Sequence, residues 1–413
     1  MAKTVFVINA GSTSIKYQLI DVDAGQRLAS GLVERIGQDV STVAHSNGDT
    51  EFEVTARIAD HTRGMEHVME MFRSHGPDLA KSGLVAVGHR VVQGGDIYAA
   101  PALATPEVKA TIAELSVLAP LHNPPNLAGI EAAQHALPDL PHVAVFDTAF
   151  HRTMPPAAYT YAIPRDLAAA HKIRRYGMHG TSHRYVSRKT AELMGKRPQD
   201  VNVIVIHIGG GGSVCAVQAG KSIETSMGLT PLQGLVMATR CGDIDPAILF
   251  YLHRQAGMGF DELDAMCNKA SGLLGLGGSP DMRDIRRMAA EGDQDAQIAL
   301  ATFSHRVKSY IGAYYAHLGR VDAIAFTAGI GENDDATRAE CCAGLESFGI
   351  AIDPAANNGL RGGVSKRISP EDSPVQVWVV ATNEELEIAR EAWELVEEGE
   401  CNGAAGGCTC SAG

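Results

Sequence analysis

The sequence predicts an α/β protein built from two similar halves. Apolar β-branched runs alternate with amphipathic segments over most of the 413 residues, as mixed sheets with covering helices require. A strand, a Gly/Ser loop and a second strand occupy Val5–Ile20, and the same pattern returns at Val203–Gln218, 198 residues later. Glycine is in excess, at 44 residues, and gathers at such loops. The repeat predicts two related units, each opening with a hairpin.

Charge and hydropathy exclude several classes of protein. Lys and Arg number 35 against 48 Asp and Glu, a net charge of −13, and no basic block could follow a phosphate backbone, so nucleic acid is not an expected partner. Apolar runs such as Val203–Ile206 and Val377–Ala381 fall far short of the ~20 residues that span a membrane. The N-terminus lacks a signal-peptide pattern, because a β-rich run, Thr4–Ile8, follows almost at once. We expect a soluble cytoplasmic protein.

The cysteines predict no disulfide framework. Five lie in the body of the chain without a C-x-x-C pair, which is typical of reduced thiols: Cys215, Cys241, Cys267, Cys341 and Cys342. The others lie in the Gly/Ala/Ser-rich segment Cys401–Gly413, for which we predict disorder. A metal held by Cys408 and Cys410 is the weaker alternative.

Several boundaries follow from local signals. Turn-rich stretches at Pro120–Asn126 and Thr153–Pro164 favour a boundary between the halves near residue 150. Helical spacing predicts a helix over His305–Leu318, and Val321–Thr327 follows as a buried strand. Thr382 and Glu385 have the spacing of a capping box, so a last helix is expected from there to Gly399.

Three small-residue loops are candidate anion sites. The first hairpin tip carries Asn9, Ser12, Ser14 and Lys16, which offer hydroxyls and one ammonium beside exposed amides. The second tip, His207–Ser213, has no side-chain bulk over four glycines, so a phosphate can approach its backbone. A third loop, Gly329–Asn333, is expected to lead from a strand into a helix beginning at Asn333 or Asp334, a suitable place for a nucleotide phosphate. Neither a P-loop nor a Rossmann motif is present.

Cationic side chains beside glycines mark a second group of candidates. They lie in Gly88–Gly95, Tyr176–His183 and Thr239–Pro246, and Asp147 follows the strand-like run His142–Phe146. On an acidic protein, such a set predicts a cationic pocket with one or two carboxylates, suited to an anionic substrate and a metal. His122 is a further candidate donor, although an isolated histidine is more often structural.

Ordered motifs from about residue 4 to 396 resemble those of the acetokinase family of short-chain carboxylate kinases. They are Asn9–Lys16, Gly88–Arg90, Phe146–His151, His179–His183, Met237–Pro246, Ser279–Asp284, Gly329–Asn333 and Thr382–Glu385. The resemblance implies two duplicated actin-like (ASKHA, ribonuclease H-like) domains, with mixed sheets flanked by helices and an active-site cleft between the domains. It assigns residues 1–150 plus a returning helix 384–399 to the first domain and 151–383 to the nucleotide-binding domain, leaves 400–413 as a disordered tail, and implies a homodimer.

The resemblance also assigns roles to residues. Asn9 and Glu384 would hold Mg²⁺, with Mn²⁺ as the alternative ion. Asp147, His179 and Arg240 would act at the transferring phosphoryl group, and Arg90 would bind the carboxylate, with His122 nearby. ATP or ADP would contact Lys16, His207, Ile208, Gly209, Gly210, Gly211, Asp281, Met282, Arg283, Gly329, Ile330, Gly331, Glu332 and Asn333. The implied reaction is reversible phosphorylation of acetate to acetyl phosphate.

This chemistry needs charge and alignment rather than a base. A phosphoryl group in flight carries negative charge on its equatorial oxygens, which Arg240, His179 and Mg²⁺ would stabilise. An alkyl carboxylate, with a pKa of roughly 4, is already ionised at pH 7. We therefore predict that Asp147 orients an arginine or the metal's water shell instead of transferring a proton.

Departures from the family pattern bear on specificity. Gly210 stands where an Asn is usual, so one side-chain contact to a phosphate is lost; Gln93 replaces a His, and Met178 replaces a Phe. Val92, Leu121, Met178 and Pro231 would line a small apolar hole. Such a pocket discriminates one methylene by only about 1–3 kcal/mol and Met is pliable, so propionate or another short-chain acid is the alternative to acetate. An actin-like or chaperone-like ATP switch ranks third, because no substrate-binding module follows the last helix.

Overall fold

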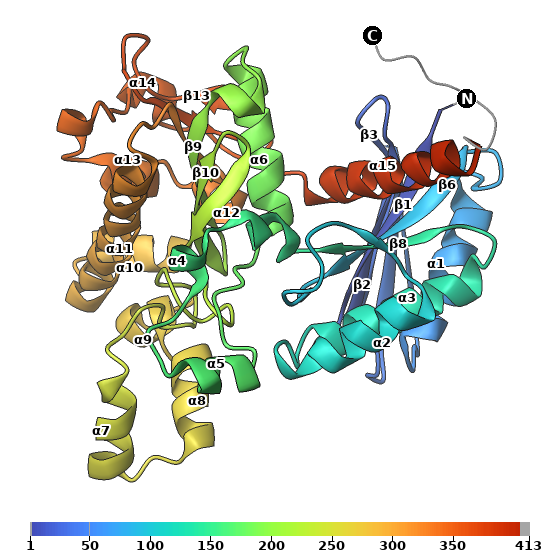
Figure 1. Ribbon diagram of the computed structural model, residues 1–413, viewed down its shortest axis with the longest axis horizontal. Helices are drawn as coiled ribbons and strands as arrows, with labels where there is room; N and C mark the ends of the chain where they lie inside the picture. The colour runs from blue at the N-terminus through green and yellow to red at the C-terminus, as the bar shows by residue number, and fades with distance from the viewer. Residues whose placement is uncertain (1, 49, 405–413) are drawn as a thin grey trace. The chain divides into compact units, whose positions relative to one another are not determined.

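The computed structural model describes residues 2–48 and 50–404. This part of the chain forms two compact units (Figure 1). Unit 1 contains the chain up to Ala149 and again from Asn383, and unit 2 contains Phe150–Thr382. The chain therefore passes from unit 1 into unit 2 and returns to unit 1 with its last helix.

Unit 1 is built on an eight-stranded mixed sheet in the order β5-β4-β3-β2-β1-β6-β8-β7. Strands β1, β6 and β8 run parallel, and the other neighbours are antiparallel. The strands are β1 (Thr4–Gly11), β2 (Ser14–Asp21), β3 (Gln26–Glu34), β4 (Ser41–Asn47), β5 (Thr50–Ala56), β6 (Leu84–Val91), β7 (Ala102–Leu103) and β8 (His142–Phe146).

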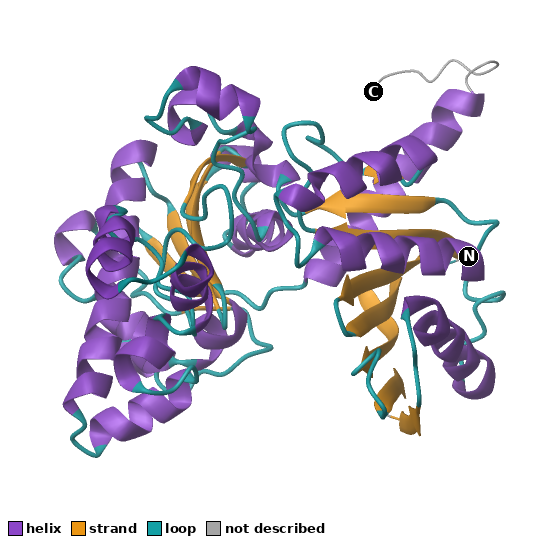
Figure 2. Cartoon of the chain, turned by 90° about the horizontal axis from the view of Figure 1, so that it is seen from below, coloured by secondary structure: helices purple, strands orange, loops and turns teal. Residues whose placement is uncertain are grey.

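Helices cover both faces of this sheet (Figure 2). They are α1 (His61–His75), α2 (Pro106–Glu114), η1 (Leu115–Val117), α3 (Asn123–Ala136) and α15 (Glu384–Ala404). Phe6 and Ile8 point to the face of α1 and α3, in one apolar cluster with Val68 and Ala133. On the opposite face α15 lies so close to β6 that a Cβ on Gly88 would be 2.9 Å from Ile388 Cγ2. Glycine at this position lets the returning helix reach the sheet.

Unit 2 has a six-stranded mixed sheet in the order β11-β10-β9-β12-β14-β13. Strands β9, β12 and β14 run parallel, and the remaining pairs are antiparallel. The strands are β9 (Asn202–Ile208), β10 (Gly212–Gln218), β11 (Lys221–Thr225), β12 (Ala323–Thr327), β13 (Lys366–Arg367) and β14 (Gln376–Val379).

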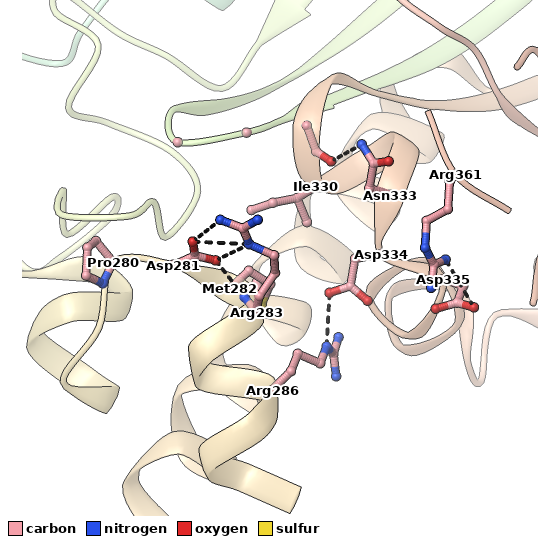
Figure 3. A pocket seen from close by; sticks show the side chains of 13 residues that line it. Pro280, Asp281, Met282, Arg283, Arg286, Ile330, Asn333, Asp334, Asp335 and Arg361 are labelled. Atoms are coloured by element: carbon pink, nitrogen blue, oxygen red, sulfur yellow. Dashed lines mark hydrogen bonds and ion pairs between the residues drawn. The ribbon is translucent and has the colours of Figure 1, made fainter. Parts of the chain in front are cut away.

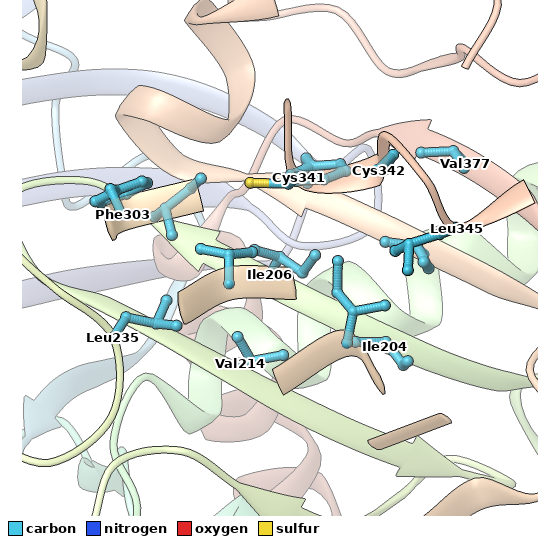
Figure 4. Packing of buried hydrophobic residues seen from close by; sticks show 14 of the residues in the cluster. Ile204, Ile206, Val214, Leu235, Phe303, Cys341, Cys342, Leu345 and Val377 are labelled. Carbon is cyan, nitrogen blue, oxygen red and sulfur yellow. The ribbon is translucent and has the colours of Figure 1, made fainter. Parts of the chain in front are cut away.

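Alternation along β9 gives unit 2 two cores. Ile204 and Ile206 join the larger cluster with Phe303 of α11 and Cys341 of α13 (Figure 4), whereas Val203 joins a second cluster under α6. The helical segments are η2 (Ala149–Thr153), which begins at the last residue of unit 1, α4 (Pro156–Tyr159), α5 (Arg165–Ala170), α6 (Gly180–Leu193), η3 (Pro198–Asp200), α7 (Ala247–Ala256), α8 (Phe260–Lys269), α9 (Gly272–Gly277), α10 (Met282–Ala290), α11 (Gln294–Leu318), α12 (Ala328–Asn333), α13 (Asp335–Cys342), η4 (Glu346–Phe348) and α14 (Pro354–Asn357).

The two sheets share one plan. In unit 1 the order β3-β2-β1-β6-β8 has the same strand directions as β11-β10-β9-β12-β14 in unit 2. The hairpins of the sequence repeat are β1–β2 and β9–β10, at the same place in each sheet. The predicted α/β class with two duplicated, helix-flanked mixed sheets is confirmed.

The ends of some elements differ from the predictions. The predicted capping box at the last helix is wrong: Asn383 Oδ1 accepts from the Leu386 amide at 3.0 Å, while the Thr382 amide donates to Glu332. The helix continues past Gly399 to Ala404, because a helical glycine costs only about 1 kcal/mol and no proline follows. The rest of the predicted tail, with Cys408 and Cys410, lies outside the described residues.

Two further expectations concern the membrane and the thiols. Among the helices of the described residues, none has both the length and the apolar character needed to cross a bilayer. The five cysteines of the body of the chain are free thiols.

Candidate active site

A tight glycine turn connects β9 to β10. The Gly209 amide donates to the Gly211 carbonyl at 2.8 Å, and the Ala238 amide donates to the Gly210 carbonyl at 3.1 Å. A Cβ on Gly210 would meet no atom of the described chain within 4 Å. The turn therefore presents bare backbone to open space, which a phosphate can approach.

A pocket of about 910 Å³ lies beside this turn in unit 2 (Figure 3). Its volume is at the upper end of the roughly 300–1,000 Å³ typical of small-molecule sites. Eight of the residues predicted to bind nucleotide line it: Gly209, Gly210, Asp281, Met282, Arg283, Gly329, Ile330 and Asn333. Pro280, Arg286, Asp334, Asp335 and Arg361 complete the lining.

Three arginines of the pocket are paired with carboxylates. Arg283 donates to Asp281, and this bond lowers the pKa of the Asp281 carboxyl to about 2. Arg286 donates to Asp334 at 3.0 Å and to Glu340 at 2.6 Å, and Arg361 lies 3.6 Å from Asp335. Burial opposes the charge of Arg286, but its two carboxylates raise its pKa overall. Arg286, at 22% side-chain exposure, is held in place by its two carboxylates, whereas Arg283 and Arg361 are mostly exposed. Within the lining itself, three arginines face three aspartates, so the charges of the lining balance.

The third glycine segment is a helix and not a loop. Residues Ala328–Asn333 form α12 directly after β12, and α13 begins at Asp335 with Asp334 as its N-cap. The turn is possible because Ala328 adopts a φ of +66°, which brings Gly329 and Ile330 to the pocket. Gly331 is buried in contact distance of Ile208, and Glu332 accepts from the amides of Ala328 and Thr382. The expected loop over Gly329–Asn333 was therefore wrong, whereas the helix expected from Asn333 or Asp334 begins one residue later, at Asp335.

His179 and Arg240 lie on the other side of the glycine turn. A Cβ on Gly211 would be 3.8 Å from His179 Nε2 and 3.5 Å from Arg240 Nη1. His179 precedes α6 with a φ of +58°, and its ring stacks on His207 with centroids 4.2 Å apart. Arg240 donates to the Pro231 carbonyl at 3.0 Å, and burial lowers its pKa from the ordinary value. One imidazole nitrogen and one cation thus face the space over Gly211.

Arg90 and Asp147 form a forked ion pair in unit 1. They stand at the ends of the parallel strands β6 and β8, whose carboxyl ends meet at one edge of the sheet. Arg90 Nη2 donates to Asp147 Oδ2 at 2.6 Å and Nε donates to the same oxygen at 3.1 Å. Burial opposes the charge of Arg90, but Asp147 and Glu384 raise its pKa above the ordinary value. Because the Asp147 side chain is only 2% exposed, its carboxylate holds Arg90 in a fixed direction.

Asn9, Lys16 and Glu384 belong to the same unit. Asn9 and Lys16 are partners in the β1–β2 register, and Glu384 begins α15. Lys16 forms an ion pair with Glu385. Burial raises the pKa of Glu384, although Arg90 acts in the opposite direction. Asn9 and Glu384 offer amide and carboxylate oxygens, which Mg²⁺ prefers, and a cation would compensate the charge of the half-buried Glu384, so these residues fit the implied ion.

The residues predicted to line the acyl pocket differ in exposure. Val92 and Met178 are buried, Leu121 is 72% exposed, and His122 is half-buried just before α3. The loop that carries Val92 is fixed by α3, because the Val92 amide donates to Asn126 Oδ1 at 3.1 Å. The Pro-rich stretch around Asn123 thus begins a helix inside unit 1.

Comparison of the sequence with a model of a known protein family shows to which family this chain belongs. The model of the acetokinase family matches residues 4–390. The chain belongs to the acetokinase family. This match covers both units and every candidate site residue named above.

Relatives and solved structures agree with this membership. The chain is 56% identical to an acetate kinase of Clavibacter sepedonicus over 388 residues, which cover 94% of this chain and 98% of that one. A Porphyromonas gingivalis acetate kinase structure matches with a TM-score of 0.92 and 40% identity, covering 96% of this chain and all of the other. A propionate kinase from Francisella tularensis matches with a TM-score of 0.87 and 41% identity, covering 95% and 99%.

Some residues of this candidate site are absent from the sequence-based candidates. Arg286 could have been predicted from the sequence, because it follows Arg283 by one helical turn of α10 and so lies on the same side of that helix. Arg361 had no local signal, since it comes from a turn after α14 that only the folded chain brings to the pocket. Ser213 contacts His179 and was considered only as the end of a glycine loop.

Proposed function

We propose that this protein is an acetate kinase that phosphorylates acetate reversibly with Mg²⁺ and ATP, giving acetyl phosphate and ADP by direct in-line transfer. The observation that carries the proposal is the convergence of His179 Nε2 and Arg240 over Gly211, next to the pocket of about 910 Å³. A nucleotide in that pocket would extend its phosphates along the glycine turn. The names of the relatives support the same activity.

Catalysis at the phosphoryl group is electrostatic in this proposal. The transition state spreads negative charge over three equatorial oxygens, and donors aimed at them stabilise it without reorganisation. Arg240 supplies a full positive charge and His179 an N–H. The Pro231 carbonyl holds the guanidinium of Arg240, and the stacked His207 ring holds the imidazole of His179.

The acceptor carboxylate needs alignment by Arg90. A planar guanidinium binds a carboxylate through paired N–H donors, so it sets the direction of attack. Asp147 accepts from Nε and Nη2 of Arg90 and thereby fixes that plane. Acetate is ionised at neutral pH, so Asp147 acts as a positioning residue and no general base is required.

Asn9 and Glu384 would hold Mg²⁺, with Mn²⁺ as a substitute, through their oxygens. When bound, the ion neutralises charge on the phosphate oxygens of ATP. Lys16 stands opposite Asn9 in the hairpin and can exchange Glu385 for a phosphate.

Propionate is the second candidate substrate. Met178 stands where a Phe is usual, and its flexible side chain can adapt to one more methylene. A relative with 41% identity is named a propionate kinase, which is compatible with this alternative.

We also propose a cytoplasmic homodimer. Large apolar side chains on and around α7 and α8 are exposed, among them Phe250 (58%), Tyr251 (65%) and Phe260 (79%). Phe250 and Phe260 border an apolar groove of about 320 Å³. A face of this kind is suited to a second copy of the chain.

Trapping of acyl phosphate with hydroxylamine tests the function. The purified chain is given Mg²⁺, ATP and acetate, propionate or butyrate, and the variants Arg90→Ala and Arg197→Ala are compared. Arg197 is an exposed arginine paired with Asp200 and serves as the matched control. The proposal expects the highest kcat/KM with acetate, its loss in Arg90→Ala and its retention in Arg197→Ala. If no carboxylate yields product while ATP is hydrolysed, the proposal fails and an ATP switch replaces it.

A further inference from the structure

A hydrogen-bonded chain of buried side chains ends at His179. Ser213 Oγ, at 0% exposure, lies 2.9 Å from His179 Nδ1 and 2.7 Å from His183 Nε2. Ser213 is on β10, and the two histidines are at the start of α6. Helix α6 packs on this face of the sheet, and His183 and Ser213 are fully buried there.

The number of available hydrogens limits which group donates in each of these two hydrogen bonds. A serine hydroxyl has one hydrogen and two lone pairs. If Ser213 accepted from both ring nitrogens, its hydrogen would have no acceptor among the described residues, because these two nitrogens are its side-chain partners. It therefore donates to one ring nitrogen and accepts from the other. If His183 Nε2 carries a proton and donates to Ser213, then Ser213 donates to His179 Nδ1. If His179 Nδ1 carries the proton instead, Ser213 donates to His183 Nε2. The ring proton of His183 must then be on its other nitrogen, His183 Nδ1.

The far nitrogen of His183 decides between the two arrangements. His183 is fully buried, and its Nδ1 has no hydrogen-bond partner among the described residues. A proton on that nitrogen would be an orphaned buried N–H, which folded proteins rarely contain, whereas a bare lone pair is tolerated more readily. Double protonation is also disfavoured, because burial and the nearby His151 and His207 hold the pKa of His183 well below its ordinary value.

We propose that His183 and Ser213 are positioning residues, which hold His179 in the tautomer that carries its proton on Nε2. In this tautomer Nδ1 accepts from Ser213, and Nε2–H is directed to the space over Gly211 that Arg240 also faces. The inference deepens the proposed function and rests on it in one respect, that a phosphoryl oxygen occupies this space. The opposite tautomer would present a lone pair to that oxygen and repel it.

The tautomer can be read directly from nitrogen chemical shifts. Long-range ¹H–¹⁵N spectra of the full chain with ¹⁵N-labelled histidine, recorded without substrates, distinguish a protonated from a bare ring nitrogen. The His179 signals are assigned by their loss in His179→Gln. We expect a protonated Nε2 and a bare Nδ1 in the wild type, and a mixture of tautomers in Ser213→Ala and His183→Ala.

Two variants separate positioning from general structural damage. Ser222→Ala removes a bond of the same kind, between buried Ser222 Oγ and His151 Nδ1 at 2.8 Å, and we expect it to leave the His179 signals unchanged. If His183→Ala does not fold, His183→Gln keeps an N–H donor near the Nε2 position and should restore the wild-type tautomer. In Ser213→Ala we expect kcat to fall about 10- to 100-fold, with the KM for ATP within about threefold.

A wild-type His179 protonated on Nδ1, or a pattern unchanged in Ser213→Ala, would overturn the inference. Failure of the proposed function is seen separately, as the absence of acyl phosphate from the wild-type chain. The spectra do not depend on turnover, so the two failures cannot be confused.

Discussion

The replacement Asp147→Asn tests whether Asp147 acts only through Arg90. In the structure the carboxylate accepts three contacts from Arg90, at 2.6, 3.1 and 3.3 Å, and its side chain is 2% exposed. Asparagine keeps the shape and one acceptor oxygen but removes the charge and turns an N–H₂ group towards the guanidinium. The forked ion pair is therefore replaced by a single contact between the charged guanidinium and a neutral amide oxygen.

The expected fall in kcat/KM follows from the kind of hydrogen bond that Asp147→Asn removes. A hydrogen bond to a charged group contributes about 1.5–3 kcal/mol net, and Arg90, at 21% side-chain exposure, is screened only in part. At about 1.4 kcal/mol for each factor of ten, we expect kcat/KM for acetate to fall roughly 10- to 150-fold. The KM for ATP should stay within about threefold, because Arg90 and Asp147 contribute nothing to the lining of the pocket beside Gly209.

A double-mutant cycle gives the decisive comparison. Acetate-dependent formation of acyl phosphate is measured for the wild type, Asp147→Asn, Arg90→Ala and the double variant. If Asp147 only orients Arg90, the asparagine has no further effect once Arg90 is absent. The pH–rate profile is recorded for each protein over the same range.

Two results would refute this reasoning. One is a further loss of more than about fivefold when Asp147→Asn is added to Arg90→Ala, since the carboxylate would then act on something else. The other is the disappearance, in Asp147→Asn alone, of a limb of the pH–rate profile that the wild type shows. That result would identify Asp147 as a proton-transfer group.

Four more outcomes are expected. Gly210→Asn should lower the KM for ATP about 2- to 10-fold, because the asparagine side chain adds one hydrogen bond to the nucleotide. The denaturation midpoint should stay unchanged, because no atom lies within 4 Å of the added Cβ. A lowered midpoint would contradict the open turn. Arg338→Met should lower the free energy of unfolding by at least about 2 kcal/mol in urea titrations and raise the KM for ATP. The reason is that buried Arg338 donates to Asn357, Gly331 and Leu360 beside the pocket. An unchanged denaturation midpoint would contradict this stabilising role of Arg338. Phe260→Asp should convert a dimer to a monomer in sedimentation, whereas Phe348→Asp, at another exposed aromatic, should not. Burial holds the pKa of His89 well below 6.5, so below about pH 6.5 His89 is protonated in the unfolded chain while it stays neutral in the folded chain. The free energy of unfolding should therefore fall by up to about 1.4 kcal/mol per pH unit below about pH 6.5. The variant His89→Gln should flatten that slope.

The sequence determined the fold class because its signals are local. Val203–Ile206 is apolar at every position, as a central strand buried on both faces must be, and the structure places it in the middle of the sheet of unit 2. The repeat of Val5–Ile20 at Val203–Gln218 predicted two related hairpins, which occupy the same position in both sheets. Glycine turns, strand ends and cationic motifs are local as well, and they indicated most of the candidate residues.

Helix ends were less predictable, because competing caps differ by little energy. The spacing of Thr382 and Glu385 favoured a capping box, yet Asn383 caps the helix, since Glu385 pairs with Lys16 and Thr382 bonds to Ser182. The helical turn of Gly329–Asn333 requires Ala328 at a positive φ, which no local pattern predicts. In both places tertiary contacts overrode the local preference.

The sequence by itself determined the duplicated α/β fold and the residue types of the site, since apolar periodicity, glycine turns and motif order are local properties of the chain. Only the tertiary structure decided what those residues do to one another. It pairs Arg90 with Asp147 across 57 positions, brings Arg361 to the pocket, and joins Ser213 to His179 and His183. These contacts depend on strand order and helix packing, and their distances and burial, which no pattern along the chain encodes, set the charge and the direction of each donor.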